Sequence, residues 1–209
     1  MSSRHETGRP RDPQDDSPVW ENRIKIGPWT QISRAVTYNN PWIRVEHHQV
    51  QDPSGRDGVY GVVHFKNRAL ACVPLHEDGT VTLVGQHRYP LDLWTWEIPE
   101  GGGSREADPL TEMQRELMEE TGLSASEWIP LGVIHPSNSV TDETAHLWLA
   151  RGLTEGSLAR ESTEGDMKTM RVPFAEAVAM ALDGRITDAL TVTALFRASG
   201  WLTSASSRT

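Results

Sequence analysis

A dense group of carboxylates lies around residues 115–123, which read RELMEETGL. On a helix, with about 100° per residue, four glutamates of this region share one arc about 100° wide, whereas Arg115 lies outside it. They are Glu112, Glu116, Glu119 and Glu120. Like charges one turn apart destabilise a helix by about 0.2–0.5 kcal/mol per pair, and a hard divalent cation such as Mg²⁺ would relieve that repulsion. Spacing alone leaves open whether this is a metal site or an ordinary solvated helix surface.

The helix that would carry these glutamates has a signal at each end. Asp108 suits an N-cap, Pro109 suits the first helical position and Gly122 suits the residue after the helix. Three apolar residues share a separate face of the same helix. They are Leu110, Met113 and Leu117. We therefore expect a helix over Pro109–Thr121 that buries its apolar face and presents its acidic arc elsewhere.

The segment before this helix, residues 94–103, reads WTWEIPEGGG. It predicts a strand that ends in a glycine triplet, and glycine lets the backbone turn sharply or approach a ligand closely. A glycine triplet alone is typical of a flexible loop. Its position immediately before an acidic helix favours a ligand site at the end of the strand.

The elements around this site predict an α+β fold. Expected strands cover residues 43–50, 59–65, 69–75, 81–89, 94–98, 128–134 and 145–150, and further expected helices cover 174–182 and 188–199. Strands first, then a helix, more strands and two late helices favour an α/β/α sandwich with a mixed sheet. We expect one domain over residues 19–203, between disordered tails at 1–18 and 204–209 whose polar composition cannot bury enough surface to fold.

Composition narrows the class of partner. The formal net charge of the 209-residue chain is −9, so we expect no nucleic-acid and no membrane partner, because those surfaces bind basic proteins. No apolar run approaches about 18 residues, and the polar N-terminus has no apolar h-region, so we expect neither a transmembrane helix nor a secretory signal. Cys72 is the only cysteine, which fits a reducing cytoplasm, and its place within an expected strand predicts a small buried apolar residue.

The glycine loop and the acidic helix together resemble the Nudix hydrolase family. The family signature is G-x5-E-x7-R-E-U-x-E-E-x-G-U, where U is aliphatic; Gly101 opens it here and residues 115–123 close it at the correct distance. The pattern places its first glutamate, which supports the loop–helix–loop in the family, where this chain has Ala107, and Glu106 comes one residue early.

Flanking residues resemble the ADP-ribose pyrophosphatase branch of that family over about residues 40–200. The segment QHRYP at 86–90 is similar to the Q-x-R-Y of that branch, and EIPEG at 97–101 is similar to its E-L-P-A-G. Pro136 and the segment GRITD at 184–188, which precedes a helix, also fit this branch. The resemblance implies the Nudix fold with its loop–helix–loop motif, and a homodimer whose contacts include N-terminal strands within about residues 20–65.

The resemblance also implies a set of site residues. The ligands of Mg²⁺, with Mn²⁺ as a possible substitute, would be Glu116, Glu120, Glu119 and the main-chain carbonyl of Glu100. Arg115 would orient the glutamates beside the catalytic Glu119 and Glu120, although a plain i,i+4 ion pair with Glu119 is the alternative. The general base would come from an acidic loop, with Glu164 the first choice and Glu161 the second. Substrate-binding residues would be Arg88, Glu97, Gly101 and Gly102.

These residues lead to one main functional hypothesis and two alternatives. The main hypothesis is Mg²⁺-dependent hydrolysis of the diphosphate bond of a nucleoside diphosphate sugar, with ADP-ribose giving AMP and ribose 5-phosphate. One alternative is another nucleotide sugar, such as GDP-mannose. The other is a catalytically silent ligand-binding module, which Ala107 favours and the retained glutamates oppose.

Overall fold

The computed structural model describes residues 23–156 and 166–206. Its chain divides into two compact units. The N-terminal unit ends at Lys66 and also takes in residues 137–142, whereas the C-terminal unit contains residues 67–136 and everything from Glu143 onward. The predicted tail at 1–18 and the predicted base residues Glu161 and Glu164 lie outside the described residues.

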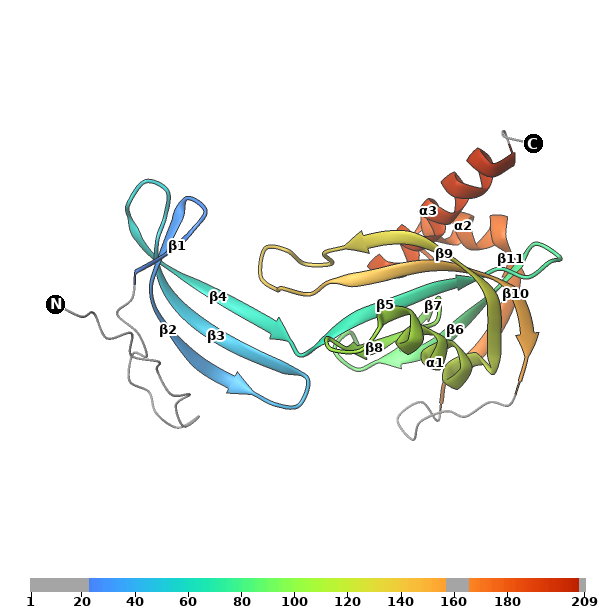
Figure 1. The fold of residues 1–209 in the computed structure, drawn as a ribbon, viewed down its shortest axis with the longest axis horizontal. Helices are drawn as coiled ribbons and strands as arrows, with labels where there is room; N and C mark the ends of the chain where they lie inside the picture. Colours follow the sequence, from blue (N-terminus) through green and yellow to red (C-terminus); the bar gives the residue numbers. More distant parts are fainter. Residues whose placement is uncertain (1–22, 157–165, 207–209) are drawn as a thin grey trace. The chain divides into compact units, whose positions relative to one another are not determined.

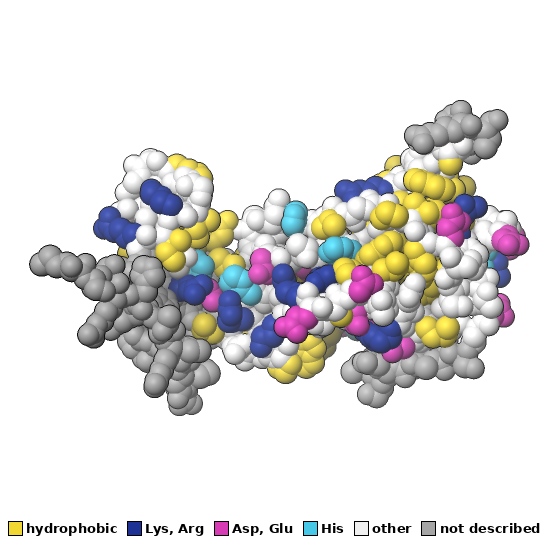
Figure 2. Space-filling model, viewed as in Figure 1, with side chains coloured by type: hydrophobic (Ala, Val, Ile, Leu, Met, Phe, Trp, Pro, Cys, Tyr) yellow, Lys and Arg dark blue, Asp and Glu magenta, His cyan; other side chains and the backbone are white. Residues whose placement is uncertain are grey.

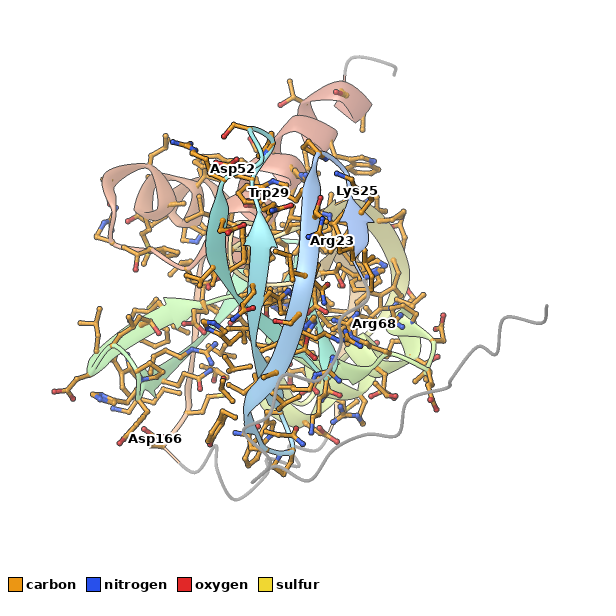
Figure 3. The ribbon with its side chains drawn as sticks, turned by 90° about the vertical axis from the view of Figure 1, so that its left-hand side faces the viewer. Arg23, Lys25, Trp29, Asp52, Arg68 and Asp166 are labelled. Carbon is orange, nitrogen blue, oxygen red and sulfur yellow. The ribbon has the colours of Figure 1, made fainter. Side chains whose placement is uncertain are left out.

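The N-terminal unit is a four-stranded antiparallel sheet in the order β1-β2-β3-β4 (Figure 1). Its strands are β1 (Ile24–Ile26), β2 (Trp29–Asn39), β3 (Ile43–Gln51) and β4 (Asp57–Phe65). Trp29 at the start of β2 and Asp52 just after β3 lie near the same end of the sheet (Figure 3). The expected strands at 43–50 and 59–65 are confirmed, whereas β2 was not expected because its sequence, WTQISRAVTYN, mixes polar and apolar residues without a clear alternation.

The C-terminal unit contains two further sheets, in the orders β8-β5-β10-β9 and β11-β6-β7. Their strands are β5 (Asn67–Pro74), β6 (Thr80–Arg88), β7 (Leu93–Glu97), β8 (Glu100–Ser104), β9 (Leu123–Ile134), β10 (Ala145–Glu155) and β11 (Lys168–Pro173). The pair β5–β10 is parallel and the other pairs are antiparallel. The mixed sheet of the sequence prediction is therefore present.

Three helices cover the central strands β5 and β10: α1 (Pro109–Thr121), α2 (Phe174–Asp183) and α3 (Ala189–Ser206). Successive side chains of a strand point to opposite faces. Residues of one face, including Leu70 and Cys72, pack with α1, whereas their neighbours, including Ala71 and Val73, pack with α2 and α3 (Figure 1). Because both faces of β5 are buried, its sequence is a continuous apolar run rather than an alternating one. This layering is the predicted α/β/α sandwich.

Two boundaries differ from the sequence prediction. The helix expected to end at Gly200 continues to Ser206, into the segment assigned to a tail, because Gly200 does not adopt the left-handed conformation that ends helices. The glycine triplet, expected as a loop, forms most of β8 and pairs with β5. Its pairing partner lies about thirty residues upstream, so local glycine content could not predict it.

The described residues form no helix that is both long enough and apolar enough to span a bilayer. On the visible face of the described residues, acidic and basic side chains lie interspersed (Figure 2).

Candidate active site

Helix α1 begins and ends at the predicted residues. The Asp108 carboxylate accepts a hydrogen bond from the Thr111 backbone N–H at 2.8 Å, which satisfies one of the donors that a helix start leaves open. Gly122 adopts φ 72° and its N–H donates to the Met118 carbonyl at 2.8 Å. These two caps fix where the helix begins and ends, and the helical period then sets the relative directions of its glutamates.

The acidic arc of α1 is turned partly into the protein. Glu116 is 7% exposed and Glu120 is 2% exposed, whereas about a quarter of the Glu112 and Glu119 side chains is exposed. Burial raises the pKa of the neighbouring Cys72 thiol, and the charge of Glu120 raises it further. Buried carboxylates are costly without compensating charge. An ordinary solvated surface is therefore the wrong interpretation for Glu116 and Glu120, and Cys72 is buried as predicted.

The glycines of β8 allow α1 to lie against this strand. A Cβ atom at Gly101 would lie only 2.2 Å from Cδ of Glu116, and one at Gly103 would lie 2.6 Å from Cδ1 of Leu70. The backbone N–H of Glu100 donates to Oε2 of Glu120 at 3.1 Å. The strand backbone thus lies directly beside the buried carboxylates. Gly102 is exposed, and a Cβ there would meet the Asn67 side chain at 3.3 Å.

Arg115 connects the glutamates of the helix. Its guanidinium donates to Glu116 at 2.6 Å and to Glu112 at 3.3 Å, and it also pairs with Glu119. Partial burial opposes protonation, yet the charges of Glu116 and Glu119 raise the pKa of Arg115. Although its Cα lies outside the acidic arc, its long side chain reaches three carboxylates. Arg115 therefore makes the i,i+4 pair with Glu119 and also orients Glu116.

A second ionic group lies where β7 ends and β8 begins. Arg88 donates through Nε to both carboxylate oxygens of Glu97, at 3.0 and 3.1 Å, and its Nη2 pairs with Glu97 and Glu100. The Thr95 hydroxyl donates to Glu97 at 2.6 Å. Since Glu97 is 2% exposed, this is a buried cluster rather than a surface ion pair.

Asp188 joins this cluster, although its place in the sequence did not predict a role in the site. One ligand oxygen from each of Glu97, Glu100 and Asp188 lies within 4.8 Å of the others. Burial, with the charges of Asp188 and Glu97, raises the pKa of Glu100 well above its usual range. Asp188 precedes α3 and accepts the Thr191 backbone N–H at 2.7 Å. The only sequence signal at Asp188 was this N-cap pattern. It indicates that a helix begins there, but it does not indicate that Asp188 lies near Glu100.

A cavity of about 280 Å³ opens beside this cluster. Its lining comprises Arg88, Pro90, Leu91, Thr95, Glu97, Glu100, Thr187, Asp188 and Ala189. The cavity therefore combines a cationic side chain with several carboxylates and a few apolar contacts, as small-molecule sites do. The predicted base residues Glu164 and Glu161 lie outside the described residues.

Replacing Arg88 with alanine is expected to destabilise the protein by about 3 kcal/mol, because the substitution leaves the buried carboxylates of Glu97 and Glu100 without their counter-charge. Urea unfolding followed by circular dichroism measures the loss. Arg185→Ala is the matched control, since its partners Asp183 and Glu176 are about half exposed and such pairs contribute little. Equal losses in the two variants would contradict the structural role given to Arg88.

Two family models match this chain, and the boundary between them lies close to the boundary between the two structural units. A family model described as "Nucleoside diphosphate sugar hydrolase N-terminal domain" matches residues 29–63. A second, described as "NUDIX domain", matches residues 65–194, which contain both the α1 glutamates and the Arg88 cluster.

Similar individual proteins extend this match. An ADP-ribose pyrophosphatase of Mycobacterium tuberculosis is 32% identical over 165 residues, which cover 77% of this chain and 78% of the relative. An ADP-ribose pyrophosphatase of Bacillus subtilis is 27% identical, covering 78% of this chain and 89% of the relative. The crystal structure of an ADP compounds hydrolase superposes with a TM-score of 0.77 at 20% identity, covering 87% of this chain and 98% of that one. This likeness confirms the predicted fold.

Proposed function

The chain belongs to the Nudix family, and on that premise we propose that it hydrolyses the diphosphate bond of ADP-ribose to give AMP and ribose 5-phosphate. The observation that carries the proposal is the pair of buried carboxylates, Glu116 and Glu120, held against the glycine strand β8. The names of two relatives, both ADP-ribose pyrophosphatases, supply the substrate.

The donor set at β8 fits a hard divalent cation. Glu116, Glu119 and Glu120 offer carboxylate oxygens, and the main-chain carbonyl of Glu100 is a further candidate, so Mg²⁺ suits the site and Mn²⁺ is a possible substitute. The fit is supported by the absence of a side chain at Gly101, which leaves room for the Glu116 carboxylate. When bound, the metal would neutralise phosphate charge and lower the pKa of a bound water. Such a cation also reconciles an anionic substrate with a chain of net charge −9.

The protein's own side chains would position the substrate and move its protons. Arg115 holds Glu116 and Glu119 in place through its ion pairs. Arg88 and Glu97 form part of the cavity wall beside Glu100, where Arg88 is placed to meet an anionic group. Gly101 and Gly102 keep the adjoining backbone accessible to a substrate. We assign the general base to Glu164, which would take a proton from the attacking water.

We further propose that the active form is a cytoplasmic homodimer joined through the N-terminal sheet. This sheet exposes large apolar side chains, among them Trp42 at 68% and Val59 at 69%, and exposed apolar patches commonly mark interfaces. Light scattering from the purified chain measures the mass of the particle. A monomer at micromolar concentration would contradict the proposal.

A substrate panel tests the proposed activity. The purified chain, with Mg²⁺, is incubated with ADP-ribose, other ADP-sugars and GDP-mannose, and nucleoside monophosphates are quantified. AMP from ADP-ribose at the highest kcat/KM is the expected result. Preferential release of GMP from GDP-mannose would favour another nucleotide sugar as substrate. Tight binding of ADP-ribose without turnover of any compound would favour the catalytically silent module.

Ala107→Glu is expected to change kcat by less than about threefold. The family resemblance implies that a glutamate at this position would support the motif by pairing with the arginine, but here Arg115 already pairs with Glu112, Glu116 and Glu119. An exposed or half-exposed additional ion pair contributes little. Steady-state kinetics with ADP-ribose measures the change. A tenfold or larger gain would show instead that Ala107 weakens the site.

A further inference from the structure

A second group of metal-ligating side chains lies in the N-terminal unit, on one face of its sheet. Glu46 and His48 are alternate residues of β3 and therefore point to the same side. In the register of the neighbouring strand β4, Val62 lies opposite Glu46, and His64 is the next residue on the same side. Residues 137–142, which belong to the same unit, bring Asp142 against His64.

The two histidines converge on one carboxylate oxygen of Glu46. Oε2 of Glu46 lies 2.9 Å from Nε2 of His48 and 3.4 Å from Nε2 of His64. The three ligand atoms all lie within 4.8 Å of one another. Only 4% of the Glu46 side chain, 10% of the His48 side chain and 25% of the His64 side chain is exposed. The group is therefore preformed and largely shielded from water.

The hydrogen bonds of His64 decide which of its ring nitrogens can bind a cation. Nδ1 lies 2.9 Å from Oδ2 of Asp142, while Oδ1 of Asp142 accepts the Phe65 backbone N–H at 3.0 Å. An ionised carboxylate only accepts, so Nδ1 carries a proton, and in the neutral ring Nε2 presents a lone pair. Nε2 is buried and has no hydrogen-bond partner among the described residues. It faces a carboxylate oxygen, so either a second ring proton or a bound cation must lie between these two atoms.

We propose that Glu46, His48 and His64 bind a transition-metal dication of the Zn²⁺ class. Two imidazoles and one carboxylate are a known donor set for zinc, with bonds of about 2.0–2.2 Å that place tetrahedral ligands about 3.4 Å apart. The measured separations of 2.9 and 3.4 Å from Glu46 approach that spacing. Asp142 would act from outside the metal shell, as carboxylates do when they hold the second nitrogen of a liganding histidine.

Two arginines near Glu46 weaken this site without blocking it. Nε of Arg44 lies 3.0 Å from Oε1, the other carboxylate oxygen of Glu46. Nη1 of Arg34 lies 3.7 Å from Oε2, but 47% of the Arg34 side chain is exposed, so it can turn into solvent. Burial opposes ionisation of Glu46, yet the hydrogen bond to His48 and the two arginines lower its pKa. The carboxylate is therefore available as an anionic ligand.

Zinc titration of the full-length protein tests the proposal. Chelator-treated chain is titrated with Zn²⁺ by calorimetry in millimolar Mg²⁺, which competes with Zn²⁺ for the carboxylates of α1. One tightly bound equivalent is expected in the wild type and should be lost in His64→Ala and in His48→Ala. His47→Ala is the matched control, because His47 belongs to the same strand but is exposed on its other face. Binding that survives both substitutions, or is lost equally in the control, would overturn the proposal.

A measurement on the wild-type protein removes any dependence on how the variants fold. Imidazole ¹⁵N shifts recorded during the Zn²⁺ titration identify the coordinating nitrogens directly, and Nε2 of two histidines is expected to move. Asp142→Asn should weaken Zn²⁺ binding by about 10–100-fold while keeping the ligands, as loss of an outer partner does. If no imidazole nitrogen shifts on addition of Zn²⁺, these histidines do not bind it. The outcome is independent of ADP-ribose turnover.

Discussion

Glu120→Gln is expected to lower kcat for ADP-ribose hydrolysis by about 10³-fold. Metal stabilisation of developing charge is worth several kcal/mol, and each 1.36 kcal/mol corresponds to about a tenfold change in rate. Glutamine preserves the shape of the side chain and an oxygen that can accept the Glu100 N–H, at present 3.1 Å away. It removes the negative charge from a residue that is 2% exposed, so the proposed cation would lose a charged ligand that water does not replace.

Steady-state kinetics across a range of Mg²⁺ concentrations, with circular dichroism to verify folding, measures this effect. The matched control is Glu106→Gln, which makes the same chemical change at an exposed position before α1 and should leave kcat within about twofold. Wild-type turnover in Glu120→Gln would show that this residue is not a metal ligand. An equal loss in Glu106→Gln would point to net charge rather than to ligation.

Local signals in the sequence were sufficient for the helix that carries these glutamates. Asp108 and Gly122 mark both of its ends, and a fixed angular period then determines which residues share a face. The same period allowed the i,i+4 pair of Arg115 with Glu119 but could not show that Arg115 also reaches Glu112 and Glu116. The reach of a long side chain depends on its rotamer rather than on the position of its Cα. The family resemblance supplied its orienting role instead.

The parts of the site that depend on distant segments were not predictable in this way. Asp188 lies beside Glu97 and Glu100 because α3 packs at the end of β7, where the Ile98 N–H donates to the Thr191 hydroxyl at 3.1 Å. The carboxylate of Glu100, paired with Arg88, also had no sequence signal. The glycines of β8 correctly indicated that some group lies close to this backbone, but they could not identify that group. The approaching group is the Glu116 carboxylate, which makes Gly101 a test of the whole arrangement.

Gly101→Ala is expected to lower kcat by about 10²-fold with little loss of stability. The new Cβ would lie 2.2 Å from Cδ of Glu116, whereas ordinary contacts begin at 3.4 Å, so the carboxylate must move by about 1 Å. A displacement of that size in a reacting site can cost about 10²-fold in rate. Since Cδ of Glu116 is near the end of a flexible side chain, this side chain can move aside without a change in the fold. ADP-ribose kinetics and thermal unfolding, measured on the same preparation, separate the two effects.

Gly103→Ala provides the contrast, because the same methyl group added two residues along β8 meets the core instead. Its Cβ would lie 2.6 Å from Cδ1 of the fully buried Leu70 and 3.0 Å from Cβ of Glu112. Overpacking of this kind costs about 1–3 kcal/mol, so its main effect should be a lower melting temperature. The two variants therefore separate placement of a carboxylate from packing of the strand. Were Gly101→Ala to lose stability as Gly103→Ala does while retaining wild-type kcat, the position of Glu116 against β8 would have no part in catalysis.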